Sequence, residues 1–382
     1  MRSPLKDEFL LDPNVVYLNH GSFGACPRPV FEAYQRWQLE LEREPVDFIG
    51  RRRGILMAEA RARLAAYLGA EASEVVYFPN PTTAANMAVR SLALGPGDEV
   101  LATDHEYGAM ERTWHFYAER AGFSYIRRPM PLPMTTAEAF VDAFWGGVNE
   151  HTRVIFISHI TSPTALRFPV EAICQRARAA GILTIIDGAH APGQISLDLH
   201  AVGADIYIAA AHKWLCAPKG SAFLYARPEV QAWLKPLVVS WGYDSAAPSE
   251  SHFIDYHEFQ GTRDFSAALA TPAAIDFQAA HDWPAVRADC HALVQGARQR
   301  INEMTGLDSI CPDSTDWFGQ MAAIRLPAID FGHVSTQLWE HYHIEVPLTN
   351  WNGQAFVRIS CQAYNSAEDV EALIRALAEL LA

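Results

Sequence analysis

Several features that mark particular classes of protein are scarce or absent in this sequence. The six cysteines are scattered without a CxxC pair, which argues against both a zinc site and a disulfide framework. No apolar run approaches the roughly 20 residues of a membrane span, and the first residues lack a signal-peptide core. Basic residues cluster only at Arg51–Arg53, and the net charge is −14, which argues against nucleic-acid and membrane partners. These absences predict a metal-free cytoplasmic protein.

Two common catalytic motifs are also missing. The HGSFG segment has His20 where a nucleophile elbow needs a glycine, two residues before Ser22. No GxGxxG motif follows an early strand, as a nicotinamide-dependent dehydrogenase requires. The sequence therefore favours neither a serine hydrolase nor a dehydrogenase.

Lysine is scarce as well, because the chain has only four, Lys6, Lys213, Lys219 and Lys235. Only Lys213 follows a strand-like apolar run, DIYIAAAHK, while Asp187 ends a second such run, ILTIID. Parallel strands end at one edge of a sheet, so the amine and the carboxylate are expected to meet there. Pyridoxal phosphate chemistry needs this pair, an amine for the Schiff base and a carboxylate for the pyridine nitrogen. From the pair alone, a surface lysine at a strand end is an equal alternative.

The chain has 382 residues, half of them hydrophobic, which predicts about two compact domains. Strand-like and helix-like runs alternate, which indicates a parallel sheet with helices on both faces. The expected elements are helices at 58–68, 82–94 and 170–180, and strands at 74–78, 100–104, 153–160, 182–187 and 205–213. Residues 237–264 are aromatic, polar and loop-like. The C-terminal third predicts a smaller α+β domain that ends in a strand at 355–360 and an amphipathic helix.

Seven segments of the chain, in order, are similar to those of one enzyme family. They are YLNHGSFG at 17–24, TDHEYGA at 103–109, HITSPTALRFPV at 159–170, DGAHAPG at 187–193, HKWLCAPKGSAFLY at 212–225, QGTRD at 260–264 and VRISCQAYNSAEDV at 357–370. The sequence resembles fold-type I pyridoxal-phosphate enzymes of the class V aminotransferase superfamily, and within it the isopenicillin N epimerase-like branch. The resemblance implies an α/β fold with a large, mostly parallel-sheet domain at 26–265 and a smaller α+β domain at 266–382. Residues 1–25 would pack with the small domain.

The resemblance also implies catalytic roles. Lys213 would form the Schiff base and shuttle protons, and Asp187 would pair with the pyridinium nitrogen. A strand-end aspartate that caps a turn is the structural alternative for Asp187. Either His105 or Tyr107 could stack on the cofactor ring and act as the second acid, and we favour Tyr107 because Gly108 leaves room beside it.

The remaining cofactor contacts are implied in the same way. Thr82 and Thr83 would bind the phosphate at a helix start, although threonine N-capping would look the same in sequence. His212 resembles the family's phosphate-contacting histidine, and Ala210 replaces a serine that many relatives carry. His190 would lie beside the cofactor, and a buried structural histidine is the alternative. Ser162 would lie near the cofactor's phenolic oxygen. Thr262 would reach the partner's cofactor in a homodimer.

Arg358 resembles the superfamily's arginine for the substrate carboxylate. An arginine in the apolar run FVRIS is costly without a partner, and a surface strand is the alternative. The resemblance also places Asn19 at the substrate. Arg263 could hold a second acidic group, as could Arg51–Arg53, which read equally well as a solvated basic face.

The type of reaction stays open at this stage. Ile344 occupies the place of the nucleophilic cysteine of cysteine desulfurases, which disfavours persulfide chemistry. Epimerisation, β-elimination and transamination share α-proton removal and a quinonoid intermediate, so the cofactor contacts cannot separate them. We expect an epimerase or β-lyase, with a class V aminotransferase or a non-catalytic pyridoxal-binding protein as alternatives.

Overall fold

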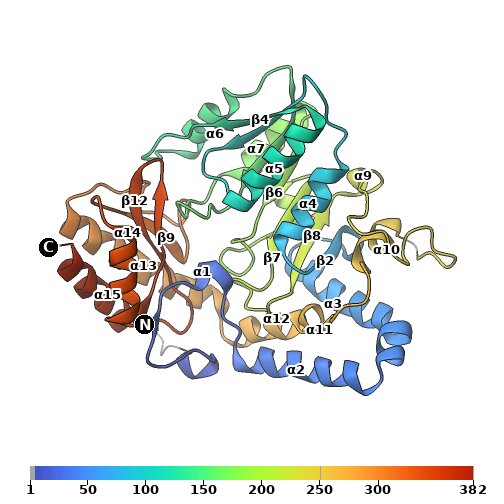
Figure 1. Ribbon diagram of the computed structural model, residues 1–382, viewed down its shortest axis with the longest axis horizontal. Coiled ribbons are helices and arrows are strands. Elements are labelled where there is room, and N and C mark those ends of the chain that lie inside the picture. Colours follow the sequence, from blue (N-terminus) through green and yellow to red (C-terminus); the bar gives the residue numbers. More distant parts are fainter. Residues whose placement is uncertain (1–4, 250, 382) are drawn as a thin grey trace.

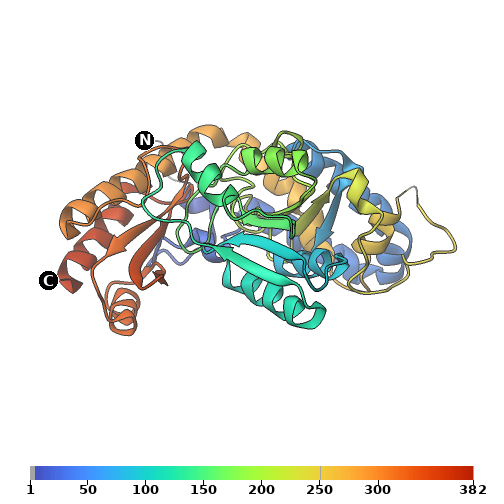
Figure 2. The same ribbon diagram turned by 90° about the horizontal axis from the view of Figure 1, so that it is seen from above.

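The computed structural model describes residues 5–249 and 251–381. A seven-stranded sheet with its helices forms one part of the molecule. The C-terminal elements form a second part at one end of the molecule (Figures 1 and 2). The N-terminal part contributes η1 (Lys6–Glu8), β1 (Val16–Tyr17), α1 (His20–Phe23), α2 (Arg28–Arg43), the π-helix η2 (Asp47–Arg52) and α3 (Arg53–Tyr67). Helix α1 lies between the two parts in Figure 1.

The main sheet has the strand order β2-β8-β7-β6-β5-β3-β4. Only β8 runs antiparallel to its neighbours, and the other pairs are parallel. The strands are β2 (Val75–Phe78), β3 (Glu99–Thr103), β4 (Ser124–Arg128), β5 (Thr152–Ser158), β6 (Leu183–Asp187), β7 (Ile206–Ala210) and β8 (Ala222–Ala226). Ser158 and Asp187 are register partners at the carboxyl ends of β5 and β6. The sheet therefore delivers its terminal polar residues to one edge.

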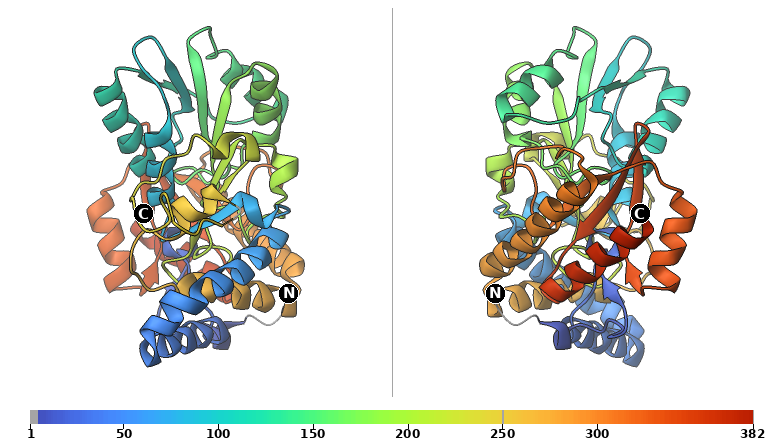
Figure 3. Two further views of the ribbon diagram at one scale, coloured as in Figure 1. Left: turned by 90° about the vertical axis from the view of Figure 1, so that its right-hand side faces the viewer. Right: turned by 90° about the vertical axis from the view of Figure 1, so that its left-hand side faces the viewer.

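Helices cover both faces of this sheet because its inner strands are apolar on both sides. On β2, Val76 and Phe78 belong to the same buried apolar cluster as residues of α4 (Pro81–Ser91) and α5 (Gly108–Ala121), whereas Val75 and Tyr77 belong to the cluster that includes residues of α3 and α7 (Val170–Ala179). Figure 3 shows α5 and α7 on opposite sides of the strands. The shorter helices of this part are η3 (Ala72–Glu74), α6 (Ala137–Trp145), α8 (Leu199–Val202) and α9 (Pro228–Gln231).

The C-terminal part is built on a three-stranded antiparallel sheet of order β11-β12-β9. Its strands are β9 (Met321–Leu326), β11 (Leu348–Trp351) and β12 (Gln354–Ser360), and its helices are α13 (Trp283–Thr305), α14 (Phe331–Glu340) and α15 (Ala367–Leu380). Strand β1 pairs in parallel with β10 (Ile344–Glu345), so the N-terminal segment joins this part. Helices α11 (Ser266–Leu269) and α12 (Thr271–Ala280) pack instead against α2 and α3.

The predicted α/β architecture is confirmed, and two segments differ from expectation. Residues 237–264 are not all loop, since α10 (His252–Glu258) forms there, with Ser251 capping its start and Phe253 buried. The long insertion after β3 folds into α5, β4 and α6. Strand β4 was missed because it is a short edge strand in which most residues are exposed and two of the five are arginines, so it lacks an apolar run. No helix in the described ranges is both long and apolar enough to cross a membrane.

Candidate active site

A cavity of about 150 Å³ lies at the carboxyl edge of the main sheet. Residues at or just after the ends of β5, β6 and β7 line it, together with the end of α1 and the starts of α4 and α5. They are Ser22, Phe23, Asn80, Pro81, Thr82, Tyr107, Met110, Ser158, Ile160, Ser162, Asp187, Ala189, His190, His212 and Lys213. The strand ends thus bring together side chains that are more than a hundred residues apart in the sequence.

Lys213 presents its amine to this cavity, with Nζ 3.3 Å from His190 Nε2. Burial and the nearby Arg358 guanidinium lower the pKa of Lys213 to about 8, against the opposing effect of Asp187. The indole N–H of Trp214 donates to His190 Nδ1 at 3.1 Å, so a neutral His190 carries its proton on Nε2, facing the amine. This arrangement supplies a lysine that loses its proton near neutral pH, as a nucleophile or base requires.

Asp187 ends β6 and lines the same cavity, where it is 7% exposed. Its Oδ1 accepts a hydrogen bond from the Ala189 N–H at 3.0 Å. Burial raises the pKa of Asp187, and the Ala189 N–H and the Lys213 amine only partly offset it. A cationic ring nitrogen in the cavity would supply the charge that a buried carboxylate needs.

Arg358 is a buried cation with neutral partners. It lies on β12, is 5% exposed, and donates to the Ser162 carbonyl at 2.7 Å, to Ser162 Oγ at 3.1 Å and to Ser22 Oγ at 3.0 Å. Burial lowers the pKa of Arg358 to about 10, which the Tyr107 phenol partly offsets. Its Nε has no hydrogen-bond partner within the described residues. The arrangement suits an incoming carboxylate, which a guanidinium can bind with two parallel bonds.

The start of α4 forms another wall of the cavity. Asn80, not a threonine, is its N-cap, because Asn80 Oδ1 accepts both the N–H and the hydroxyl of Thr83 at 2.8 and 3.0 Å. Thr83 is therefore engaged by Asn80, while Thr82 lines the cavity. His212 also lines it, with Nδ1 3.0 Å from the Ser221 carbonyl. Burial lowers the pKa of His212 to about 4, and a dianion beside its ring would favour the protonated form.

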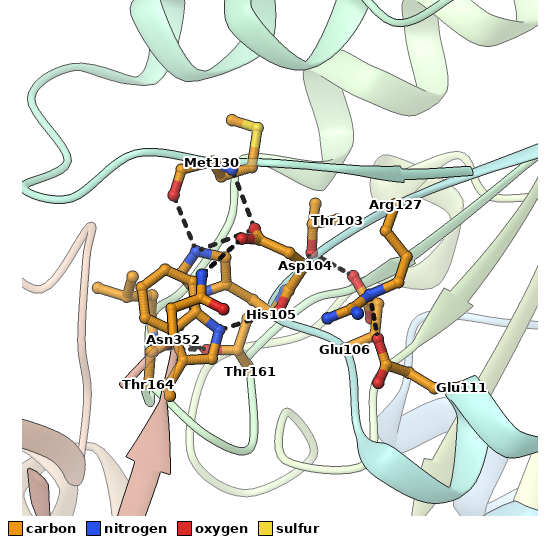
Figure 4. A network of polar contacts seen from close by, with 12 residues as sticks. Thr103, Asp104, His105, Glu106, Glu111, Arg127, Met130, Thr161, Thr164 and Asn352 are labelled. Atoms are coloured by element: carbon orange, nitrogen blue, oxygen red, sulfur yellow. Dashed lines mark hydrogen bonds and ion pairs between the residues drawn. The ribbon is translucent and has the colours of Figure 1, made fainter. Parts of the chain in front are cut away.

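The structure separates the two aromatic candidates for ring stacking. Tyr107 is 48% exposed and lines the cavity. His105 is fully buried outside it, with Nδ1 2.7 Å from Thr164 Oγ1 and its ring centroid 4.2 Å from that of Trp351, at an interplanar angle of 32°. Figure 4 shows His105 among Asp104, Met130 and Asn352, where a hairpin of the C-terminal sheet meets the turn after β3. Only Tyr107 is placed to contact a ligand in the cavity.

Besides His105, the predicted residues Thr83 and Arg358 do not line the cavity themselves, and Arg358 reaches it through its hydrogen bonds with Ser22 and Ser162, which do. Asn19, Thr262 and Arg263 also lie outside the cavity lining of this single chain. Asn19 is fully engaged, since its Oδ1 accepts the Ser22 hydroxyl at 2.5 Å and its Nδ2 donates to Glu345 at 2.7 Å. Thr262 is exposed, and the Arg263 guanidinium lies over the Phe265 ring at 4.7 Å. Asn19 can therefore act on a substrate only through Ser22. The proposed roles of Thr262 and Arg263 require a second subunit.

Sequence reasoning missed several lining residues. Ser22 was considered only as a failed nucleophile, yet its hydroxyl contacts Arg358. Ser158 ends β5, so the strand-end rule that found Asp187 could have found it. Phe23, which is 70% exposed, follows Ser22 into the cavity wall, and only the folded path of α1 reveals it.

Gly24 permits the close approach of the N-terminal segment to the lysine. It has a φ of 69°, and a Cβ there would lie 2.1 Å from the His212 carbonyl oxygen. Gly24→Ala should destabilise the protein by more than about 2 kcal/mol, as measured by urea unfolding. Gly54→Ala, at an exposed helical position with open space around the new Cβ, should be neutral or stabilising. Equal effects of the two changes would refute this packing argument.

An amine, a buried carboxylate and a buried guanidinium with only neutral partners, all near the carboxyl edge of an α/β sheet, are the groups of a fold-type I pyridoxal-phosphate enzyme. The family described as aminotransferase class-V matches residues 24–373. The chain is 36% identical to isopenicillin N epimerase of Amycolatopsis lactamdurans over 98% of this chain and 97% of that protein. It is 31% identical to putative L-cysteine desulfhydrase 1 of Oryza sativa subsp. japonica, covering 97% of this chain and 84% of that protein.

The fold agrees with these similarities. A C-DES mutant with glycine covalently linked to the pyridoxal phosphate cofactor superposes with a TM-score of 0.84 at 20% identity, covering 99% of this chain and 100% of that chain. The chain belongs to the class V aminotransferase family, and pyridoxal 5'-phosphate is its cofactor. The residues fit the cofactor, since the cavity offers an amine, an acid and a helix start that suits a phosphate.

Proposed function

We propose that this enzyme epimerises the α-carbon of an L-amino acid or eliminates its β-substituent. The carrying observation is the Arg358 guanidinium, which is buried beside the Lys213 amine with only neutral partners. Arg358 would bind the substrate α-carboxylate, and Lys213 would then take the α-proton. The bound cofactor supplies the electron sink that makes this proton acidic.

Five further residues of the cavity lining have tasks in this proposal. Asp187 would hold the ring nitrogen protonated, and His190 would orient the Lys213 amine through its Nε2–H. Thr82 and His212 would hold the phosphate. Tyr107 would stack on the ring and donate a proton from the face away from Lys213, which epimerisation requires and β-elimination does not.

The cysteines support a pathway without a protein persulfide. All six lie in the described part of the chain, none lines the cavity, and five are buried. Cys26 is partly buried, and burial raises its pKa to about 12, so its thiol stays protonated. Ile344, at the place of the desulfurase cysteine, is buried and pairs with Val16.

We also propose a homodimer in which Thr262 and Arg263 reach the partner's cavity. The exposure of Thr262 supports this proposal. So do the Arg263 Nε and NH2 atoms, which are buried without a hydrogen-bond partner in the described residues.

The reaction can be tested in deuterated water with isopenicillin N and L-cysteine, the substrates in the relatives' names. Epimerised, α-deuterated product supports an epimerase, whereas pyruvate with ammonia supports a β-lyase. Amino transfer that depends on an added keto acid would favour the aminotransferase alternative. If neither compound, nor any of a panel of other L-amino acids, undergoes α-exchange or β-elimination, the proposed chemistry is wrong.

Tyr107→Phe separates the two favoured reactions. If Tyr107 donates the second proton, the variant should still exchange the α-proton but lose epimerisation by about 10²-fold or more, the usual contribution of a general acid. NMR for exchange and chiral chromatography for epimerisation measure the two events separately. Tyr117→Phe is the matched control, because Tyr117 lies in α5 outside the cavity lining. Unchanged epimerisation in Tyr107→Phe would assign the second proton to another group.

A further inference from the structure

Glu106 is a buried carboxyl that no role described so far uses. It precedes Tyr107, is 5% exposed, and lies behind the cavity wall. Its Oε2 is 2.6 Å from Ser158 Oγ and accepts the Ser158 N–H at 3.0 Å, while its Oε1 accepts the Thr103 hydroxyl at 2.6 Å. Figure 4 shows Glu106 and Thr103 joined beside the turn that carries His105. The carboxyl thus ties the Tyr107 turn to the end of β5.

The surroundings of Glu106 favour its neutral form. Burial, with a smaller contribution from Asp187, raises the pKa of Glu106 to about 8, although its hydrogen bonds with Ser158 and Thr103 oppose the rise. The titratable groups nearby are Asp187 on β6 and Tyr125 on β4, both of which are neutral or anionic, and the Glu111–Arg127 ion pair beyond them is self-compensated. No basic group in the described ranges forms an ion pair with Glu106. Two neighbouring carboxyls in one buried region favour one proton between them.

The protonation of Glu106 decides where the Ser158 hydroxyl hydrogen points. An ionised Glu106 only accepts, so the Ser158 O–H must donate to it. A neutral Glu106 donates its proton to Ser158 Oγ across the same 2.6 Å, and the Ser158 hydrogen is then free to turn into the cavity. Asp187, the register partner of Ser158 on the neighbouring strand, lines the same cavity, although the two side chains share no hydrogen bond in this structure.

We propose that Glu106 is a positioning residue that donates its proton to Ser158 Oγ, so that the Ser158 hydroxyl donates toward Asp187 and keeps that carboxyl ionised for the cofactor ring. Hydrogen bonds to the charged form of an acid favour that form. The inference depends on the cofactor, not on which reaction follows, so it survives failure of the proposed epimerisation or elimination.

The first test measures apoprotein stability against pH. Since the folded-state pKa of Glu106 is raised, the stability linked to its proton is lost as pH rises from about 4.5 to about 8 and is constant above. The melting temperature of wild type relative to Glu106→Gln should therefore fall across this window. Ser158→Ala keeps the Glu106 carboxyl, so its melting temperature should show the same fall with pH. Glu111→Gln, which changes a carboxyl in the ion pair with Arg127, is the matched control. A difference that does not vary with pH would refute the buried neutral acid.

The second test measures the dissociation constant of pyridoxal 5'-phosphate by fluorescence titration of the apoprotein. The ratio of the wild-type constant to the Glu106→Gln constant should rise about tenfold between about pH 7 and pH 9, because one pKa unit corresponds to a tenfold change. In a Ser158→Ala background, Glu106→Gln should no longer alter the pH dependence. If Glu106→Gln changes the pH dependence of the dissociation constant equally in the Ser158→Ala background, Glu106 acts by charge alone and the relay through Ser158 is wrong. A ratio that is constant with pH would leave Glu106 a purely structural residue.

Discussion

Lys213→Ala should lose activity by about 10⁴-fold or more, because it removes both the covalent attachment and the proton carrier of the site. Cofactor affinity should fall as well, and borohydride treatment should no longer attach the cofactor to the protein. Steady-state kinetics and mass spectrometry of the treated protein measure the two losses. Because the Lys213 amine occupies the cavity wall, a smaller side chain leaves the fold intact, and thermal melting of the apoprotein should change little.

Lys235→Ala is the matched control for this change. Lys235 is exposed in the structure and lies outside the cavity lining, so its loss should leave activity and attachment unchanged. Attachment that persists in Lys213→Ala but disappears in another lysine variant would overturn the assignment of the catalytic amine.

Arg358→Ala should lower kcat/KM by about 10²- to 10³-fold, since truncating one partner of a buried charged pair costs roughly 2–5 kcal/mol. The loss should fall mainly on KM for amino-acid substrates, because Arg358 contacts the carboxylate and not the reacting bond. Cofactor attachment should survive, which distinguishes this variant from Lys213→Ala. Arg358→Lys should recover only part of the activity, since an ammonium cannot bind a carboxylate with two parallel bonds.

The control for Arg358 is Arg375→Ala, an exposed arginine on the outer side of α15. It should behave as wild type. If Arg358→Ala weakened binding of the cofactor as strongly as that of the substrate, the guanidinium would belong to the cofactor site and the proposed substrate contact would fail.

Two site residues were predictable because strand ends are visible in sequence. Asp187 and Lys213 each follow a run of residues that is buried in the structure, and the parallel sheet brings such ends to one edge. Arg358 was predictable for a related reason, because a charge inside an apolar strand needs a partner. The lysine count mattered too, since few lysines competed for the role.

Other assignments needed three-dimensional information. His105 and Tyr107 are two residues apart in one turn, and sequence cannot tell which ring faces the cavity and which packs on Trp351. Whether the cap of α4 is Asn80 or a threonine depends on backbone direction at one residue. Glu106 carried no signal in the sequence, and its carboxyl is buried because it bonds Thr103 and Ser158 at the neighbouring ends of β3 and β5.

The amino-acid order alone was enough for the layered α/β architecture and for placing Lys213 and Asp187 at one edge of the sheet, because hydrophobic periodicity and strand ends are local properties. The cofactor class came from the resemblance of seven segments to a known enzyme family. Folding in space decided which groups share the cavity, which hydroxyls Arg358 contacts and how the turn after β3 divides its side chains between core and site. Those outcomes depend on burial and on contacts between segments more than a hundred residues apart, such as Ser22 with Arg358. The desolvation that lowers the pKa of Lys213 and raises that of Glu106 arises only there.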